Sequence, residues 1–270
     1  MSSDHPRAHR TPLDRLLKLA NTPRRHDTAP LLIEGVGNVT QCADHGVRFE
    51  QLVLCKRLLR STVGQIIARR LRARGVPTVT VDPASFRRIS RAERAPGIAA
   101  VIRPPWSTLT RPGERCLWLT VDALRSPGNL GTTLRTAAAV GADGLILTSP
   151  AIDPFAPDIV RASMGTVFKL RIVRSTTRTL HAWTREHGVT IVGAHTAGHA
   201  LDVTTVFPQR CVLCIGHERQ GLTDEQSAMC DRLIRLPMLP TADSLNAGVA
   251  AGILLYAMAP HASPQWSQAR

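Results

Sequence analysis

Two segments of this chain combine polar side chains with glycines at spacings that could build a site. The first carries Asn129 and, six residues later, Arg135 on an expected helix of threonine, alanine and leucine. Such a helix does not need an arginine for packing, although an exposed structural arginine is the alternative interpretation. The second carries Glu218 between Gly216 and Gly221. Glycines at these places give the loop positive-φ freedom or leave room for a ligand.

A third segment, Ser244-Leu245-Asn246, follows a proline-bounded loop and precedes a run of alanine and glycine. Ser244 stands where a helix N-cap is expected, because its hydroxyl can accept from first-turn amides. Asn129 is expected to cap its own helix in the same way. Asn246 then lies in the first turn and offers both a donor and an acceptor. These features indicate a site built from backbone and small polar groups.

Several common sites are excluded by their missing signatures. The chain has no G-x-G-x-x-G dinucleotide motif, no Walker A loop, no nucleophile elbow and no zinc ligand set. Cys211 and Cys214 have a metal or redox spacing, but the apolar residues around them favour a buried strand. The sequence therefore predicts no metal site.

The elements around the three segments alternate between strand and helix from residue 115 to residue 260. This alternation predicts an α/β domain with a parallel sheet and helices on both faces. Ligands of such sheets bind at the carboxyl ends of the strands. All three segments follow expected strands, so they should meet at that edge. The expected strands are 116–121, 145–147, 189–194, 211–215 and 233–236, residues 167–173 are expected to lead to a further strand, and the last helix is expected over 245–258.

The remaining chain is divided by composition. Residues 1–28 are expected to form a basic flexible arm in which Leu13, Leu16, Leu17 and Leu19 indicate one short helix. Residues 29–105 are expected to form a small α/β domain, 106–114 a proline-rich linker and 261–270 a disordered tail. A basic helix is expected over 62–74. We favour a phosphate-contacting face over a merely solvated one for its arginine cluster. The cluster comprises Arg57, Arg60, Arg69, Arg70 and Arg74.

The composition points to a polyanionic partner. The formal net charge is +14 and the sequence pI is about 11.1. Nucleic acid is the first expectation and an anionic membrane surface the second, with a bias toward arginine as the alternative explanation. No apolar run approaches the roughly 20 residues that span a bilayer, and the N-terminus lacks a secretory apolar core. A cytoplasmic protein without a membrane partner is expected.

Taken in this order, the three segments resemble the TrmH-like family of RNA 2′-O-ribose methyltransferases in the SPOUT superfamily. The similarity spans about residues 117–256. The preceding module, with Glu34-Gly35 after its first strand, resembles the RNA-binding domain of longer members. The layout is also similar to thiostrepton-resistance-type methyltransferases of 23S rRNA. The alternatives are a tRNA 2′-O-ribose methyltransferase and a non-catalytic RNA-binding or ribosome-assembly protein.

This resemblance implies a deep trefoil knot, a homodimer, S-adenosylmethionine as cofactor and structured RNA as partner, with 23S rRNA favoured and antibiotic resistance as a consequence. Arg135 would be catalytic, and we prefer phosphate binding and hydroxyl alignment over a neutral arginine base. Asn129 and Glu218 would orient Arg135 and the ribose, while Ser244 and Asn246 would shape the pocket. The implied cofactor residues are Thr196, Ala197, Gly198, Gly216, Leu236, Pro237, Met238, Ser244, Leu245 and Asn246. The RNA-contacting residues would be Arg69, Arg70 and Arg161.

One departure from the family pattern follows Asn246. The chain has Ala247-Gly248 where members often carry Val-Ser. This exchange is expected to loosen the last helix without removing a polar group that the site needs.

Overall fold

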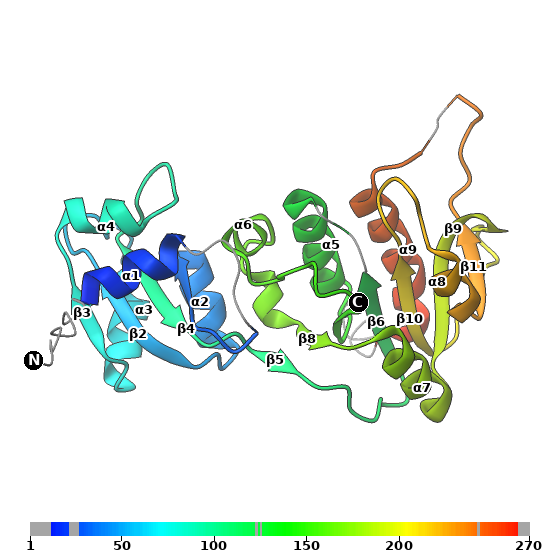
Figure 1. The fold of residues 1–270 in the computed structure, drawn as a ribbon, viewed down its shortest axis with the longest axis horizontal. Helices are drawn as coiled ribbons and strands as arrows, with labels where there is room; N and C mark the ends of the chain where they lie inside the picture. The colour runs from blue at the N-terminus through cyan, green and yellow to red at the C-terminus, as the bar shows by residue number, and fades with distance from the viewer. Residues whose placement is uncertain (1–11, 22–26, 122–123, 125, 242–243, 264–270) are drawn as a thin grey trace, which may run out of the picture. The chain divides into compact units, whose positions relative to one another are not determined.

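A computed structural model of the chain describes residues 12–21, 27–121, 124, 126–241 and 244–263 (Figure 1). The chain divides into two compact units, Met1–Pro104 and Pro105–Arg270. Most of the expected arm and the last seven residues of the chain lie outside the described residues.

The first unit is built on a mixed four-stranded sheet with the order β1-β4-β2-β3. Strand β4 runs antiparallel to β1 and β2, and β2 runs parallel to β3. The strands are β1 (Leu31–Glu34), β2 (Phe49–Leu54), β3 (Thr78–Thr80) and β4 (Ile98–Ile102). The helices are α1 (Pro12–Asn21), α2 (Val36–Asp44), α3 (Thr62–Ala73) and α4 (Pro83–Ile89).

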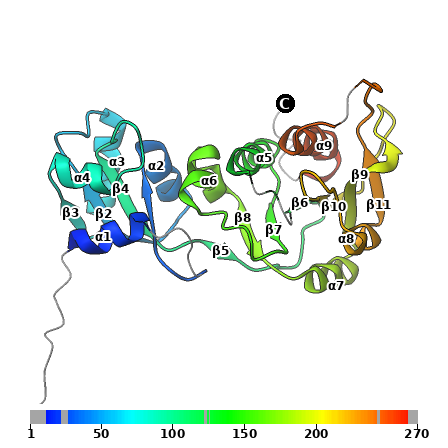
Figure 2. The same ribbon diagram turned by 45° about the horizontal axis from the view of Figure 1, so that its top comes forward.

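Helices cover both faces of this sheet. Helices α2 and α3 contact each other and the sheet on one side, and α1 contacts α4 on the other (Figure 2). Leu16 of α1 and Phe86 of α4 are fully buried in one apolar cluster with Val53 and Val101 of the sheet. Part of the segment expected as an arm is therefore a packed helix of the first unit.

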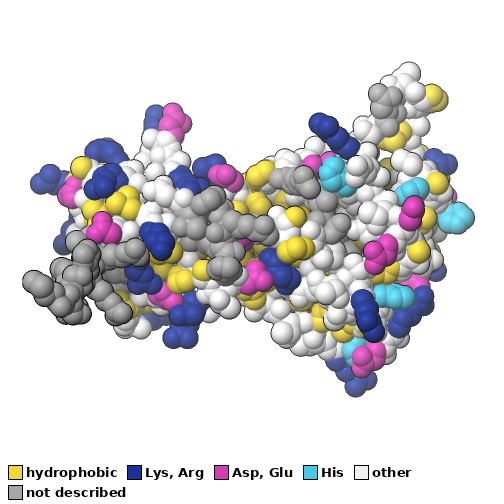
Figure 3. Space-filling model, viewed as in Figure 1, with side chains coloured by type: hydrophobic (Ala, Val, Ile, Leu, Met, Phe, Trp, Pro, Cys, Tyr) yellow, Lys and Arg dark blue, Asp and Glu magenta, His cyan; other side chains and the backbone are white. Residues whose placement is uncertain are grey.

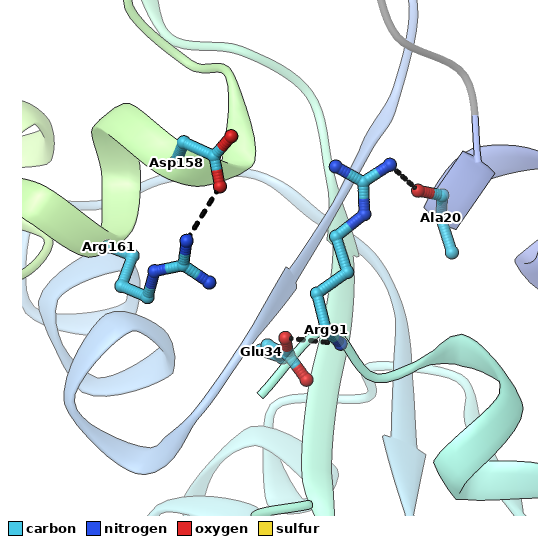
Figure 4. Close-up of polar contacts among 5 residues, drawn as sticks. All are labelled: Ala20, Glu34, Arg91, Asp158 and Arg161. Atoms are coloured by element: carbon cyan, nitrogen blue, oxygen red, sulfur yellow. Dashed lines mark hydrogen bonds and ion pairs between the residues drawn. The ribbon is translucent and has the colours of Figure 1, made fainter. Parts of the chain in front are cut away.

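Glu34, at the end of β1, fixes the turn that follows α4. Its carboxylate accepts from the Ser90 hydroxyl at 2.5 Å and from the Arg91 amide at 2.8 Å. The Arg91 guanidinium in turn donates to the Ala20 carbonyl at the end of α1 (Figure 4). Glu34 thus links β1 to the turn after α4, and Arg91 links that turn to the end of α1.

The second unit contains a seven-stranded sheet with the order β11-β9-β10-β6-β7-β8-β5. All neighbouring strands are parallel, which confirms the predicted parallel α/β class. The strands are β5 (Trp106–Ser107), β6 (Cys116–Val121), β7 (Gly144–Leu147), β8 (Arg171–Arg174), β9 (Thr190–Ala200), β10 (Arg210–Ile215) and β11 (Arg232–Arg235). The helices are α5 (Pro127–Ala139), α6 (Pro157–Ala162), α7 (Thr177–His187), α8 (Asp224–Met229) and α9 (Ala247–Ala262), with a 3-10 turn η1 (Thr166–Lys169).

Helices also cover both faces of the second sheet. Helices α5, α6 and α9 lie on one face, and α7 and α8 lie on the other (Figure 2). Every residue of the central strand β6 is buried, as expected for a parallel strand covered on both sides. Trp118 of β6 meets Trp183 of α7 edge to face, with 6.2 Å between the ring centroids. This core holds the carboxyl ends of the strands in place.

Two expected irregular segments contribute to the second unit. The linker forms β5, because Trp106 packs edge to face on Phe155 and Ser107 pairs with Val173. The tail begins within α9, which extends to Ala262, and the buried Ser263 hydroxyl donates to the Gly141 carbonyl at 3.0 Å. Within the part of the chain that the structure describes, no helix is long and apolar enough to span a membrane.

Candidate active site

The carboxyl end of β9 bulges out of the sheet. Leu233 of β11 pairs with Gly193, but the next residue, Ile234, pairs with His199, so residues 194–198 leave the ladder. A side chain at Gly198 would bring a Cβ within 2.5 Å of the Ile234 amide nitrogen. The implied cofactor residues Thr196, Ala197 and Gly198 lie in this bulge. Sequence patterning predicted a strand ending at residue 194 and could not show the return to the sheet.

The loop after β10 is closed by its own backbone. His217 and Gly221 exchange two amide-to-carbonyl hydrogen bonds of 2.8 Å. Gly221 has φ +71°, and a Cβ at Gly216 would lie 2.2 Å from the Gly221 carbonyl oxygen. Both glycines are therefore required by the shape of the loop itself. This shape presents the half-buried Glu218 toward α5.

A chain of side-chain hydrogen bonds joins the three segments. Asn129 donates through Nδ2 to Glu218 Oε1 at 2.5 Å. Asn246 donates through Nδ2 to Asn129 Oδ1 at 2.8 Å. Residues 117 positions apart thus meet at the start of α5, as the prediction of a shared sheet edge required.

The two predicted N-caps are wrong. Ser126, rather than Asn129, caps α5 by accepting from the Asn129 amide at 3.4 Å. Asn246, rather than Ser244, caps α9, and its Oδ1 accepts from the first-turn amides at 2.9 and 3.2 Å. Pro127 follows Ser126 directly, and serine before proline is a signal for a helix start that would have found the first cap. The exposed Ser244 stands outside the helix.

Gly248 lets α9 approach α5 closely. A Cβ at this position would lie 3.1 Å from the Asn129 carbonyl oxygen and 3.2 Å from Asn246 Oδ1. Gly248, where family members often carry serine, therefore favours tight packing of α9 against α5 beside Asn129 and Asn246. This contact could not be foreseen from the helix propensity of glycine.

Arg135 does not join the chain of hydrogen bonds. Six residues of α-helix place it about 9 Å along the axis from Asn129 and about 120° around it. Its exposed side chain makes no hydrogen bond or ion pair with any residue that the structure describes. Gly131, one turn before Arg135, packs against Ala162, so Arg135 borders the α6 side of α5. The contact of Arg135 with Asn129 and Glu218 that the resemblance implied is absent within one chain.

The remaining cofactor positions follow β11. Leu236, Pro237 and Met238 continue from this strand, and Leu245 precedes α9. Met238 is 38% exposed and Leu245 is 40% exposed. Together with the bulge of β9, these loops offer backbone groups, small side chains and open apolar side chains, and none of the implied cofactor residues is charged. This set fits a purine ring held by apolar contact and backbone hydrogen bonds.

The predicted RNA-contacting arginines differ in their partners. Arg161 is paired with Asp158 at 2.7 Å (Figure 4), and Arg70 with Asp44 at 2.6 Å. Arg69 is exposed and has no such partner among the described residues. Figure 3 shows lysine and arginine side chains spread over the visible face of the first unit.

The cysteine pair of β10 cannot form a shared site. Cys211 and Cys214 are three residues apart in a strand, so their side chains point to opposite faces of the sheet. Both are buried, and burial raises the pKa of the Cys211 thiol to about 12. These properties agree with packing rather than ligation.

A polar cavity of about 390 Å³ lies away from the three segments, at the amino end of β10. Arg111 and Arg210 line it together with Glu186 and His187. The carbonyl end of α7 also points there, since Arg210 donates to the His187 carbonyl at 3.1 Å. The mixed charge of this cavity distinguishes it from the uncharged cofactor loops.

The chain is similar to known proteins over most of its length. Residues 117–256 match the family model described as the SpoU rRNA methylase family. The chain belongs to this family. It is 31% identical to the 23S rRNA (uridine(2479)-2′-O)-methyltransferase of Streptomyces viridochromogenes, over 88% of this chain and 85% of that protein.

Solved structures of the same family have a similar fold. An rRNA methyltransferase from Sinorhizobium meliloti with bound AdoMet is 32% identical, with a TM-score of 0.79 and coverage of 90% of this chain and 92% of that one. The SpoU methyltransferase AviRb from Streptomyces viridochromogenes, in complex with AdoMet, is 28% identical, with a TM-score of 0.82 and coverage of 92% and 96%. Both units of this family member are therefore covered by the similarity.

Proposed function

We propose that this chain transfers the methyl group of S-adenosylmethionine to a ribose 2′-hydroxyl of 23S rRNA. The observation that carries the proposal is the chain of hydrogen bonds from Asn246 through Asn129 to Glu218, which joins three family segments at one sheet edge. The names of the similar proteins support the substrate and the position of methylation. A net charge of +14 suits a polyanionic substrate.

The cofactor would be held at the carboxyl ends of β9, β10 and β11, by the bulge of β9 and by the loops that follow β10 and β11. Residues 194–198, Gly216 and residues 236–238 supply these loops, and Ser244-Leu245-Asn246 closes them at the start of α9. S-adenosylmethionine, when bound, supplies a methyl group activated by its positively charged sulfur. The protein then has to position the ribose hydroxyl and help to remove its proton.

Arg135 would bind an RNA phosphate and align the ribose hydroxyl. Arginine stays protonated in proteins, so it is suited to binding a phosphate with two parallel hydrogen bonds and unsuited to acting as a free base. Its exposed side chain has no partner among the described residues and is available for this contact. We infer that the phosphate held by Arg135 beside the hydroxyl shares in removing its proton.

We also propose a homodimer formed through α9. Val249, Ile253 and Tyr256 lie on one face of this helix and are 48%, 42% and 51% exposed. A helix that is apolar on all sides is normally buried, so a second copy of the chain is the occupant that this face requires. Asn129 and Glu218 of one subunit could then complete the surroundings of Arg135 from the other. Ile253→Glu should convert the dimer to a monomer in sedimentation velocity, and an unchanged sedimentation coefficient would contradict this interface.

The family's trefoil knot is part of the proposal. The chain passes from β9 inward to β10, then outward to the edge strand β11, and α9 returns to contact β10 and β6. Between β11 and α9 the chain therefore crosses back from the edge of the sheet to its inner strands. Such a crossing supports a threaded connection, which ordinary folds avoid.

The first unit would contribute RNA affinity through α3. Arg69 and Arg70 are surface arginines of this helix. Neutralising both as Arg69→Gln and Arg70→Gln should weaken RNA binding and lower the salt slope by about 2, because two fewer phosphate contacts release fewer counterions. An unchanged slope in filter binding would exclude this face.

The activity is tested by transfer of radiolabel from S-adenosylmethionine to protein-free 23S rRNA. We expect labelling by the unchanged protein, and its loss in Arg135→Ala with cofactor affinity nearly intact. Arg178→Ala, on the exposed surface of α7, is the matched control and should retain labelling. Labelling of tRNA transcripts but not 23S rRNA would favour the alternative substrate. Mapping the labelled nucleotide identifies whether the modification lies at an antibiotic-binding position.

A further inference from the structure

Met164 has an unusual backbone conformation. Among the residues that the structure describes, it is the only non-glycine with a positive φ, at 53°. Its side chain is 63% exposed. A large side chain in this conformation crowds its own carbonyl. Because the Met164 side chain is exposed, it buries little apolar surface that could offset this cost. Packing within the chain therefore does not explain a methionine at this position.

The conformation arises from the way α6 ends. The Gly165 amide donates to the Val160 carbonyl at 2.9 Å, and the Met164 amide donates to the Arg161 carbonyl at 3.0 Å. This pair of hydrogen bonds is the Schellman motif, in which the residue at the position of Met164 is usually glycine. Glycine would complete the same motif without crowding.

Met164 lies beside the flank of α5 that carries Arg135. A Cβ at Gly131 would lie 2.5 Å from Ala162 Cβ and 2.9 Å from the Ser163 amide nitrogen, so the chain just before Met164 touches α5. The 3-10 turn just after it contacts α5 as well. Arg135 follows Gly131 by one helical turn and is exposed on the same side.

We propose that Met164 packs against the base of the nucleotide whose ribose is methylated. This inference rests on the proposed function, because it takes the Arg135 flank as the surface that receives RNA. A thioether side chain is flexible and makes favourable contacts with aromatic rings. Unstacked bases of RNA loops are commonly held on protein side chains in this way. The strained backbone is then retained because it aims this side chain at the substrate.

The test compares Met164→Gly with Met164→Leu in the full-length protein. Three quantities are measured: the thermal midpoint, the affinity for S-adenosylmethionine by calorimetry, and kcat/KM for a 23S rRNA transcript. We expect Met164→Gly to raise the midpoint by about 2–4 °C, since the crowding disappears. We expect kcat/KM to fall about tenfold, mainly through KM, with unchanged cofactor affinity. Met164→Leu should retain both the midpoint and most of the activity.

A second measurement separates base contact from a general effect on the loop. Once the methylated nucleotide is mapped, a transcript with an abasic residue there keeps the 2′-hydroxyl and lacks the base. If Met164 touches that base, Met164→Gly and the abasic change should not be additive in kcat/KM. Full additivity, an unchanged kcat/KM or a lowered midpoint in Met164→Gly would overturn the inference. Failure of the unchanged protein to label any 23S transcript would instead overturn the proposed function.

Discussion

Replacing Asn129 by aspartate tests the bond that joins the three segments. The exchange keeps the side-chain shape but places a carboxylate 2.5 Å from Glu218 Oε1, where an amide now donates. Two unit charges about 4 Å apart repel by about 4 kcal/mol at an effective dielectric constant of about 20. Both side chains are partly exposed and water screens them, so we expect a loss of about 2 kcal/mol, or about 4–8 °C in the thermal midpoint.

The loss should depend on pH in a defined direction. A carboxyl beside a second carboxylate holds its proton more tightly in the folded chain than in the unfolded chain. The folded state then binds more protons than the unfolded state, so stability falls as the pH rises through this window. Asn129→Asp should therefore recover stability on acidification from about pH 7.5 to about pH 5.

Urea unfolding at the two pH values measures this effect, with Asn129→Ala as the control. The control loses the same donor without adding charge, so it should be destabilised by about 1–2 kcal/mol with no recovery beyond that of the unchanged protein. If Asn129→Asp and Asn129→Ala show the same pH dependence, Glu218 does not face Asn129 in solution. The conclusion that the hydrogen bond between Asn129 and Glu218 joins these segments of the site would then be wrong.

Three further outcomes are expected. Asn246→Ala should lower the unfolding free energy in urea by about 1–2 kcal/mol, because α9 loses its cap and Asn129 Oδ1 loses its donor, whereas Asn246→Asp keeps the cap and loses only the donor to Asn129, so it should be destabilised less. Gly216→Ala should abolish S-adenosylmethionine binding in calorimetry, since its Cβ would lie 2.2 Å from the Gly221 carbonyl oxygen, and near-normal affinity would contradict this loop geometry. The buried thiol of Cys211, with a pKa raised to about 12, stays protonated in the fold, whereas the unfolded thiol ionises near about pH 8.5. Stability should therefore fall above about pH 9, and Cys211→Val should make this fall shallower in urea unfolding.

Local patterns predicted most of the elements. Alternating strands and helices gave the parallel sheet because buried parallel strands are continuous apolar runs, as in residues 116–121. The carboxyl-end rule then placed Asn129, Glu218 and Asn246 together. The rule specifies an edge of the sheet but not which atoms meet, so the sequence did not reveal that Asn129 bridges the other two.

The errors occurred where long-range contacts decide a local choice. Ser244 and Asn129 are both good N-caps by residue type, yet Asn246 and Ser126 cap the two helices. The Asn129 side chain bonds to Glu218 and Asn246 instead. The start of the expected linker forms β5 because Trp106 packs against Phe155, which is nearly fifty residues further along the chain. The side-chain partners of Asn129 and of Trp106 are not encoded within a few residues of either position, whereas the cap of α5 is signalled locally by Ser126 before Pro127.

By itself, the sequence determined the class of the fold and the three polar segments, because strand and helix periodicities and the glycine and proline positions are local properties of the chain. Only the tertiary structure decided the five-residue bulge of β9 and the bond from Asn246 to Asn129. The physical reason is that strand register and side-chain partners depend on segments that are distant in the chain and meet only when the sheet is assembled. Gly193 and Leu233 are 40 residues apart, and Asn129 and Asn246 are 117 residues apart.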